Sequence, residues 1–165
     1  MCIRDSTLGR SKAGAARERV AAINPSVEFR AVDRFLDRDG FLELLRDADL
    51  AVDALGGLDD RPVLERAAAE AGVPLVSAVV AGWTGAVATV LPGRPGPGSL
   101  LGAGAADKEN PPEEVLGTPG PTVHLAASLQ CAEALRLLAG QPPALDGKIL
   151  FFDLADMTFE TVTLD

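Results

Sequence analysis

The chain's candidate ligand-binding residues include an acidic cluster that follows a short apolar run. The cluster and the glycine pair inside it are Asp53, Gly56, Gly57, Asp59 and Asp60. Glycines at such a point would let phosphates approach the backbone closely, and a helix N-terminus just beyond them would favour an anion. The carboxylates could hold Mg²⁺, which binds one or two carboxylates together with substrate phosphates. The structural alternative is that the glycines turn the chain and the aspartates cap the next helix.

Three other side chains that could do chemistry are isolated from this cluster. Lys12 lies in the first turn of a predicted helix, where a cation is unfavourable to the helix dipole, so it either meets a phosphate or is solvated. His124 is the single histidine and lies seven residues before Cys131 on one helix. Two helical turns separate them by about 10.5 Å, too far for joint metal ligation without other ligands. We therefore interpret His124 as a core or interface residue and Cys131 as a packing residue.

Composition limits the classes of protein to consider. With 165 residues, of which 47% are hydrophobic, the chain can form one domain with a sizeable core. Its net charge of −9 disfavours nucleic acid and anionic membranes as partners. It has no apolar run that would span a bilayer and no visible secretory signal, and its two cysteines cannot form a disulfide framework or a four-cysteine zinc site. These features favour a cytoplasmic protein without zinc.

Hydrophobic periodicity predicts an α/β protein in which helices alternate with strands. The first three predicted strands should be parallel, because a helix separates each from the next. The helix nearest the C-terminus is apolar nearly all round and should be buried. The predicted helices are 9–23, 40–48, 61–71 and 122–139, and the predicted strands are 27–32, 50–53, 74–80, 86–91, 148–154 and 158–164.

Two segments stand apart from this pattern. Residues 1–6 have no strand or turn pattern, and we expect them to be an artefactual start. Residues 92–121 are dense in proline and glycine and lack periodicity, which predicts a long flexible crossover loop. The rest of 7–165 is expected to form a single domain.

The element order and six local phrases resemble the ThiF/MoeB/HesA family, the bacterial relatives of ubiquitin-activating enzymes. The similarity is closest to HesA-like members without zinc cysteines. It implies a Rossmann-like, three-layer sheet of the ThiF-type NAD/FAD-binding fold that here lacks its first β-α-β unit, so the chain would be N-terminally truncated. The phrases are GRSK leading to INP at 9–25, DLAVDALGGLDDR at 49–61, VPLV at 73–76, GWTG at 82–85, SLQ through EAL to Gly140 from 128, and Gly147-Lys148 to Asp153.

The resemblance implies ATP-dependent adenylation of the C-terminal glycine of a ubiquitin-like sulfur carrier similar to ThiS or MoaD, with Mg²⁺ and without zinc. Lys12 matches the lysine that contacts the ATP phosphates, and Asp53 matches the first aspartate of an Asp-x-x-Asp-Asn phrase. Gly56 and Gly57 would also lie at the nucleotide. A homodimer is compatible with the family.

The sequence departs from the family at several points. The family's metal-binding aspartate and the following asparagine fall on Gly56 and Gly57, so Asp59 or Asp60 would have to replace the metal ligand from a rearranged turn. The family's G-x-G-G-x-G phrase should precede residue 8 and is absent. Three hypotheses stay open: an adenylyltransferase seen as an inactive fragment, a non-catalytic ThiF-like binding module, and a fragment of a nicotinamide-dependent dehydrogenase.

Overall fold

The computed structural model describes residues 5–56, 59–94, 96–100 and 112–164. It divides into two compact units, Met1–Leu36 and Asp37–Asp165, and each is described by itself. In the part of the chain that the structure describes, no helix has the length and apolarity needed to cross a membrane.

The first unit contains η1 (Asp5–Thr7) and α1 (Lys12–Ile23). The helix begins later than its predicted start because the Ser11 hydroxyl accepts a hydrogen bond from the Gly14 N–H at 3.1 Å and caps it. None of the twelve α1 residues, all of them described, is buried, and Ile23 is 71% exposed. The predicted helix is confirmed, and its apolar residues are not buried.

The strand predicted at 27–32 is wrong. All six residues are described, and their backbone is irregular. A short alternating segment becomes a strand only when a neighbouring strand completes its hydrogen-bond ladder, and the described residues supply none here. Of the three strands expected to be parallel, 27–32, 50–53 and 74–80, only the last two form a parallel pair.

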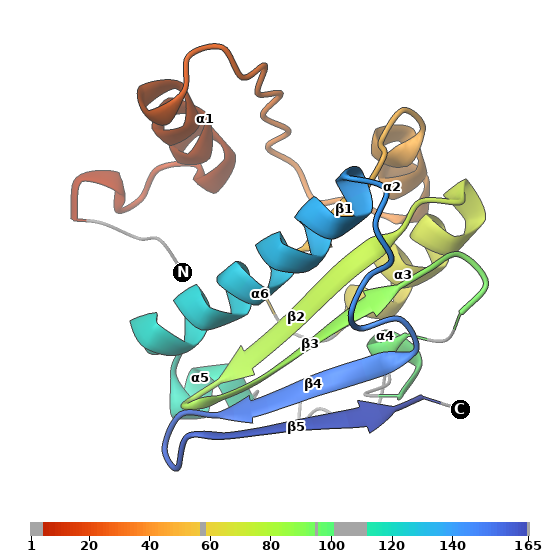
Figure 1. Cartoon of the computed structure of the whole chain (residues 1–165). Helices are drawn as coiled ribbons and strands as arrows, with labels where there is room; N and C mark the ends of the chain where they lie inside the picture. The colour runs from red at the N-terminus through yellow and green to blue at the C-terminus, as the bar shows by residue number, and fades with distance from the viewer. Residues whose placement is uncertain (1–4, 57–58, 95, 101–111, 165) are drawn as a thin grey trace. The chain divides into compact units, whose positions relative to one another are not determined.

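The second unit is built on a five-stranded mixed sheet with the order β1-β2-β3-β4-β5 (Figure 1). β1 and β2 are parallel, with Asp53 opposite Ser77, and the other neighbours are antiparallel. This confirms the predicted α/β sheet and the crossover between its first two strands. The strands are β1 (Ala51–Asp53), β2 (Leu75–Ala81), β3 (Thr84–Val90), β4 (Lys148–Asp153) and β5 (Thr158–Thr163).

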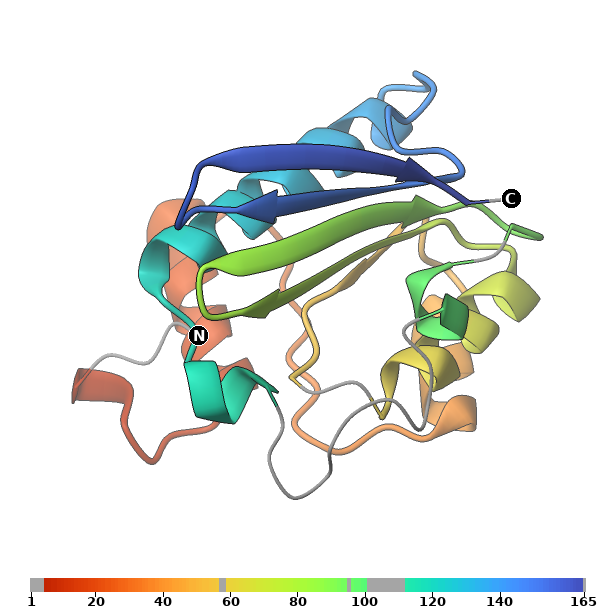
Figure 2. The same cartoon turned by 90° about the horizontal axis from the view of Figure 1, so that it is seen from below.

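Helices cover both faces of this sheet, which gives the expected three layers (Figures 1 and 2). α6 crosses one face over β2 and β3, while α3 and α4 lie on the other face. α3 matches its predicted bounds, with Pro62 in its first turn and Gly72 at φ 70° after its last. The helices are α2 (Arg38–Leu45), α3 (Arg61–Ala71), α4 (Pro97–Leu100), α5 (Pro112–Leu116) and α6 (Gly120–Leu138).

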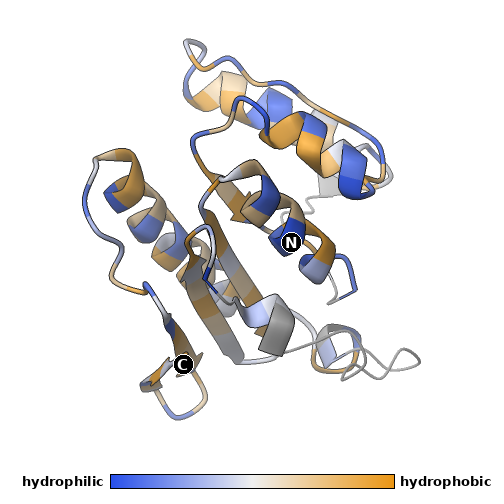
Figure 3. Cartoon of the chain, turned by 90° about the vertical axis from the view of Figure 1, so that its right-hand side faces the viewer, coloured by the Kyte–Doolittle hydropathy of each residue, from blue (hydrophilic) through white to orange (hydrophobic). Residues whose placement is uncertain are grey.

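The core lies on the two faces of the sheet, and hydrophobic residues concentrate on the central strands (Figure 3). Under α6, Val76 and Val87 are fully buried and pack with Ala126 and Phe152. The opposite face holds a smaller cluster around Ile149. Burying such side chains contributes about 1.5–3 kcal/mol each.

The prediction that α6 is apolar nearly all round and buried is wrong. Leu135 and Leu138 are 66% and 60% exposed, because only one stripe of the helix faces the sheet. Three of the four buried residues in that stripe are polar. They are Thr122, Ala126, Gln130 and Glu133.

The segment 92–121 contains two short helices, α4 and α5, in its described parts. It is tied to the sheet near its end, where the Gly82 N–H donates to the Gly117 carbonyl at 2.8 Å. Residues 95 and 101–111 lie outside the described part, and the flexibility of the segment stays a prediction.

Candidate functional site

Asp53 ends β1 and places a buried carboxylate at the carboxyl end of the parallel strand pair. The residue is 2% exposed. Its Oδ1 accepts a hydrogen bond from the Leu55 N–H at 2.9 Å, and its Oδ2 accepts one from the Ser77 hydroxyl at 2.7 Å. Oδ2 also forms an ion pair with the Arg61 guanidinium. Both carboxylate oxygens are therefore engaged within the protein.

Arg61 is the first residue of α3 and is 9% exposed. Besides its pair with Asp53, it donates to the Ala78 carbonyl at 2.8 Å and to the Leu55 carbonyl at 2.5 Å. A buried guanidinium needs such partners, because removing a charge from water costs several kcal/mol. One side chain thus joins the end of β1, the strand β2 and the start of α3.

Sequence reasoning missed Arg61 and Ser77 as members of this site. The sequence does contain a signal for Arg61. This arginine lies eight positions after Asp53, the aspartate that ends the strand, and at the residue where the next helix begins. Such an arginine can reach back to the strand end, whereas sequence analysis of this stretch concentrated on its glycines and carboxylates.

The turn beyond this ion pair is open. Gly56 is exposed, and a Cβ built on it would meet no described atom within 4 Å. Gly57 lies outside the described residues. Asp59 and Asp60 are exposed, and Asp60 occupies the N-cap position of α3 without a side-chain capping hydrogen bond to any described residue. The capping alternative is therefore not supported for Asp60.

A metal site is not preassembled in the described residues, since no group of three or more His, Cys, Asp or Glu side chains there could hold an ion. Two exposed carboxylates beside an open turn nevertheless match the donor set that Mg²⁺ takes when substrate phosphates complete its coordination. Magnesium binding by Asp59 and Asp60 stays a prediction.

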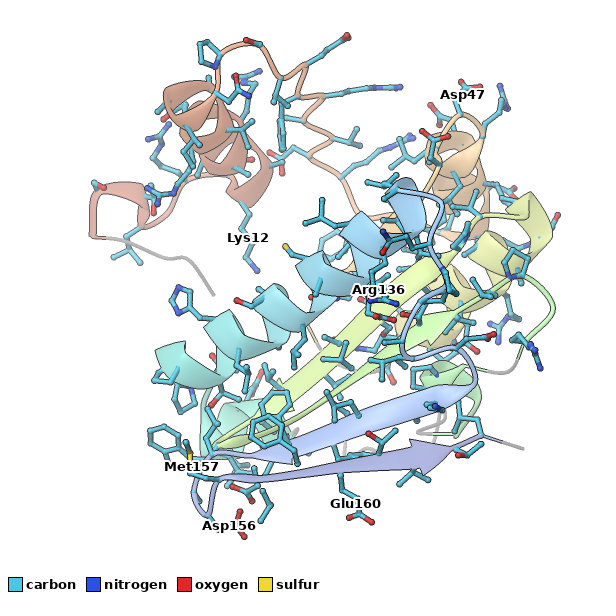
Figure 4. All side chains as sticks on the ribbon, in the orientation of Figure 1. Lys12, Asp47, Arg136, Asp156, Met157 and Glu160 are labelled. Atoms are coloured by element: carbon cyan, nitrogen blue, oxygen red, sulfur yellow. The ribbon has the colours of Figure 1, made fainter. Side chains whose placement is uncertain are left out.

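Lys12 belongs to the first unit, where it is the first residue of α1 and exposed. Figure 4 shows its side chain extended from the helix. No acidic residue occupies the first turn of α1, so the lysine charge there is not offset by a neighbour in that turn.

The two remaining candidate side chains lie on α6. His124 is exposed, and its Nδ1 lies 2.8 Å from the Gly120 carbonyl oxygen of its own helix. Cys131 is an exposed free thiol. His124 is therefore not a core residue, and its place at an interface stays a prediction. The interpretation of Cys131 as a packing residue is wrong, because it lies on the part of α6 turned away from the sheet.

A model of the ThiF family matches residues 1–165. The chain belongs to the ThiF family. This ThiF-family chain is 31% identical over 158 residues to the SAMP-activating enzyme E1 of Haloferax volcanii, covering 96% of this chain and 58% of that protein. It is 32% identical over 166 residues to the sulfur carrier protein adenylyltransferase of Thermus thermophilus, covering 95% of this chain and 60% of that protein.

The fold is also similar to that of a solved structure. The Escherichia coli MccB structure with ATP superposes with a TM-score of 0.78 at 14% identity, over 98% of this chain and 50% of that one. At this identity the likeness shows the fold, and it confirms the expected Rossmann-like class. The ThiF-family chain spans 58–60% of the length of the two relatives named above.

Proposed function

We propose that this ThiF-family chain forms part of an ATP-dependent adenylyltransferase that acts on the C-terminal glycine of a ubiquitin-like sulfur-carrier protein. The observation that carries the proposal is the open Gly56 turn, which the buried Asp53–Arg61 pair holds at the carboxyl end of the parallel strands. Ligands of open α/β sheets bind outside the carboxyl ends of their strands. The relative from Thermus thermophilus is itself a sulfur carrier protein adenylyltransferase.

In the proposed reaction a carrier carboxylate attacks the α-phosphorus of ATP, the carrier acyl adenylate forms, and pyrophosphate leaves. Gly56 and Gly57 would let the phosphates approach the backbone, since glycine presents no Cβ. Lys12 would place a positive charge against the phosphates, where negative charge develops in the transition state. Asp53 would act by holding the turn in place, because its oxygens are already engaged by Leu55, Ser77 and Arg61.

Asp59 and Asp60 would hold Mg²⁺. When bound, this ion would neutralise charge on the phosphates. The two aspartates are exposed, and the Asp60 side chain makes no capping bond to the described part of α3, so neither carboxylate has to leave a buried site to meet a ligand. We propose no zinc, and a homodimer stays a prediction.

The second candidate function is a non-catalytic binding module. It is favoured by one feature, the glycine pair at the positions where the family carries its metal-binding aspartate and the next asparagine. In that case the same turn would bind a carrier tail or a partner subunit without nucleotide transfer. Membership of the ThiF family leaves the dehydrogenase hypothesis without support.

The proposal is tested by measuring ATP binding with a protein that carries the family's glycine-rich segment ahead of Thr7. Titration calorimetry in Mg²⁺ should detect weak binding, and Lys12→Ala should weaken it about tenfold or more. Arg19→Ala, an exposed arginine on the same helix, is the matched control and should leave the affinity unchanged. If the folded protein binds no ATP, the non-catalytic function is favoured instead.

A further inference from the structure

The buried stripe of α6 holds the sheet through hydrogen bonds as well as apolar contacts. Its first member, Thr122, is fully buried and donates its hydroxyl to the Gly82 carbonyl at 3.0 Å, at the turn between β2 and β3. Its last member, Glu133, accepts the Thr89 hydroxyl at 2.7 Å and the backbone N–H groups of residues 144 and 145 at 3.0 and 2.9 Å. Directional bonds at both ends fix the position of α6 along its axis.

Gln130 lies between these two residues and contacts the candidate site. It is 6% exposed, and its Nε2 donates to the Asp53 carbonyl at 2.7 Å and to the Val76 carbonyl at 3.1 Å. A side-chain amide has two N–H donors, so both are used on the backbone of neighbouring strands. Gln130 therefore binds the last carbonyl of β1 from the α6 side of the sheet.

Leu55, two residues after Asp53, is held from the face of the sheet opposite α6. The Asp53 carboxylate accepts the Leu55 N–H, and Arg61 donates to the Leu55 carbonyl. With Gln130, these bonds fix the backbone from the end of β1 to the residue directly before Gly56. A Cβ built on Gly56 would meet no described atom within 4 Å. The bonds at Asp53 and Leu55 are therefore the ones by which the described residues hold the start of this turn.

We infer that Gln130 is a positioning residue that locks the Gly56 turn to α6. Removing its two donors leaves the Asp53 carbonyl buried without this partner, and the strand end must then shift or open to find another. The consequence for nucleotide affinity rests on the proposed function, whereas the effect on the turn does not. A displacement of α6 would also reach the turn through Gln130.

The test is native-state hydrogen exchange of the 165-residue chain with Gln130→Met, which keeps side-chain length and removes both donors. The Leu55 amide, which donates to the Asp53 carboxylate, should exchange at least tenfold faster, while the Phe152 amide in β4 keeps its rate. Gln141→Met, an exposed glutamine beyond α6, is the control and should change neither. Gln130→Asn, which keeps an amide but withdraws it by one methylene, should give the same local result if Gln130→Met does not fold.

Unchanged exchange at Leu55 would overturn the inference. An equal increase at Phe152 would also overturn it, because that marks a general loss of stability. In the protein with the glycine-rich segment, Gln130→Met should raise the ATP dissociation constant about tenfold. If Gln130→Met speeds exchange at Leu55 but no form of the protein binds ATP, the positioning role of Gln130 is supported. Only the proposed function is then contradicted.

Discussion

The Asp53 carboxylate and the Arg61 guanidinium form a buried ion pair between the last residue of β1 and the first residue of α3. The pair joins the two ends of a turn that is open at Gly56, so a buried charge pair fixes how these two ends lie relative to each other. Buried ion pairs contribute less to stability than hydrophobic residues of similar volume often would. The pair is therefore better explained by the fixed shape of the turn than by stability alone.

Breaking the pair should destabilise the chain strongly. Arg61→Ala leaves the Asp53 carboxylate buried and uncompensated, and should lower the free energy of unfolding by about 3–5 kcal/mol. Arg66→Ala, an exposed arginine on the same helix, should change it by no more than about 0.5 kcal/mol. Urea denaturation followed by circular dichroism measures both. Similar small effects of the two substitutions would show that the pair is not the constraint we describe.

A second carboxylate anchors the start of α4 to α3. Glu65 accepts the Gly96 N–H at 3.2 Å and the Gly98 N–H at 2.7 Å. A Cβ on Gly98 would lie 2.5 Å from Glu65 Oε2, so only glycine fits there while Glu65 keeps its position.

Gly98→Ala should displace the Glu65 carboxylate from its hydrogen bonds to the Gly96 and Gly98 amides, and should therefore destabilise the chain by about 1–3 kcal/mol. Glu65→Ala removes the obstructing atoms, so the double variant should lose less than the sum of the two single losses. Gly120→Ala, where the built Cβ meets its nearest atom at 3.9 Å, is the control. Strict additivity in a double-mutant cycle measured by denaturation would contradict the predicted contact.

The hairpin between β4 and β5 contains a strained residue. Among the described residues other than glycine, Met157 alone has a positive φ, at 61°, and it lies 70% exposed at the hairpin tip (Figure 4). The left-handed conformation costs a side-chain-bearing residue about 1–2 kcal/mol. Met157→Gly should therefore raise the free energy of unfolding by about 0.5–1 kcal/mol. Thermal denaturation that shows a lower midpoint for this variant would contradict the assignment.

In the first unit, the hydrogen bond from the Arg10 guanidinium to the Glu18 carboxylate lowers the pKa of that carboxyl below its ordinary value, and the positive charge of Arg10 lowers it further. A carboxyl whose pKa is depressed on folding stabilises the folded state above its unfolded pKa, and this contribution is lost as pH falls through the folded pKa. Arg10→Gln should raise the Glu18 pKa toward its ordinary value in an NMR titration. Because the pair is exposed, high salt should reduce the difference in Glu18 pKa between the unchanged protein and Arg10→Gln. A pKa difference that does not depend on salt would argue against a charge effect.

Much of the second unit could be predicted from sequence because its signals are local. The Arg61–Ala71 helix has proline near its start and glycine after its end. β2 is an apolar run, interrupted only by Ser77, between turn residues. The segment 27–32 has an equally good local pattern but forms no strand, because a strand depends on a partner far away in sequence. Local pattern alone does not distinguish these two cases.

Sequence reasoning singled out Asp53 and the glycine turn as candidates, but it did not identify the side chains that contact Asp53. The glycine turn and the aspartates stand out in the sequence, and the Gly56 turn is open as a ligand site requires. Arg61, Ser77 and Gln130 were missed because each acts on Asp53 across a strand, a turn or a layer. Only the fold brings together residues separated by 8, 24 and 77 positions.

The central claim is tested most directly by ATP–pyrophosphate exchange. The 165-residue chain alone should show no exchange, because its sequence does not contain the family's glycine-rich phrase. Losing one preorganised group that stabilises transition-state charge commonly costs about 10²–10³ in rate. The protein with the glycine-rich segment ahead of Thr7 should exchange pyrophosphate when a ThiS- or MoaD-like carrier is added, and should not do so with a carrier that lacks its terminal glycine. Asp59→Ala with Asp60→Ala should abolish this activity. If the folded, carrier-supplied protein shows no exchange, or exchange that is indifferent to the terminal glycine, the proposed adenylation is contradicted.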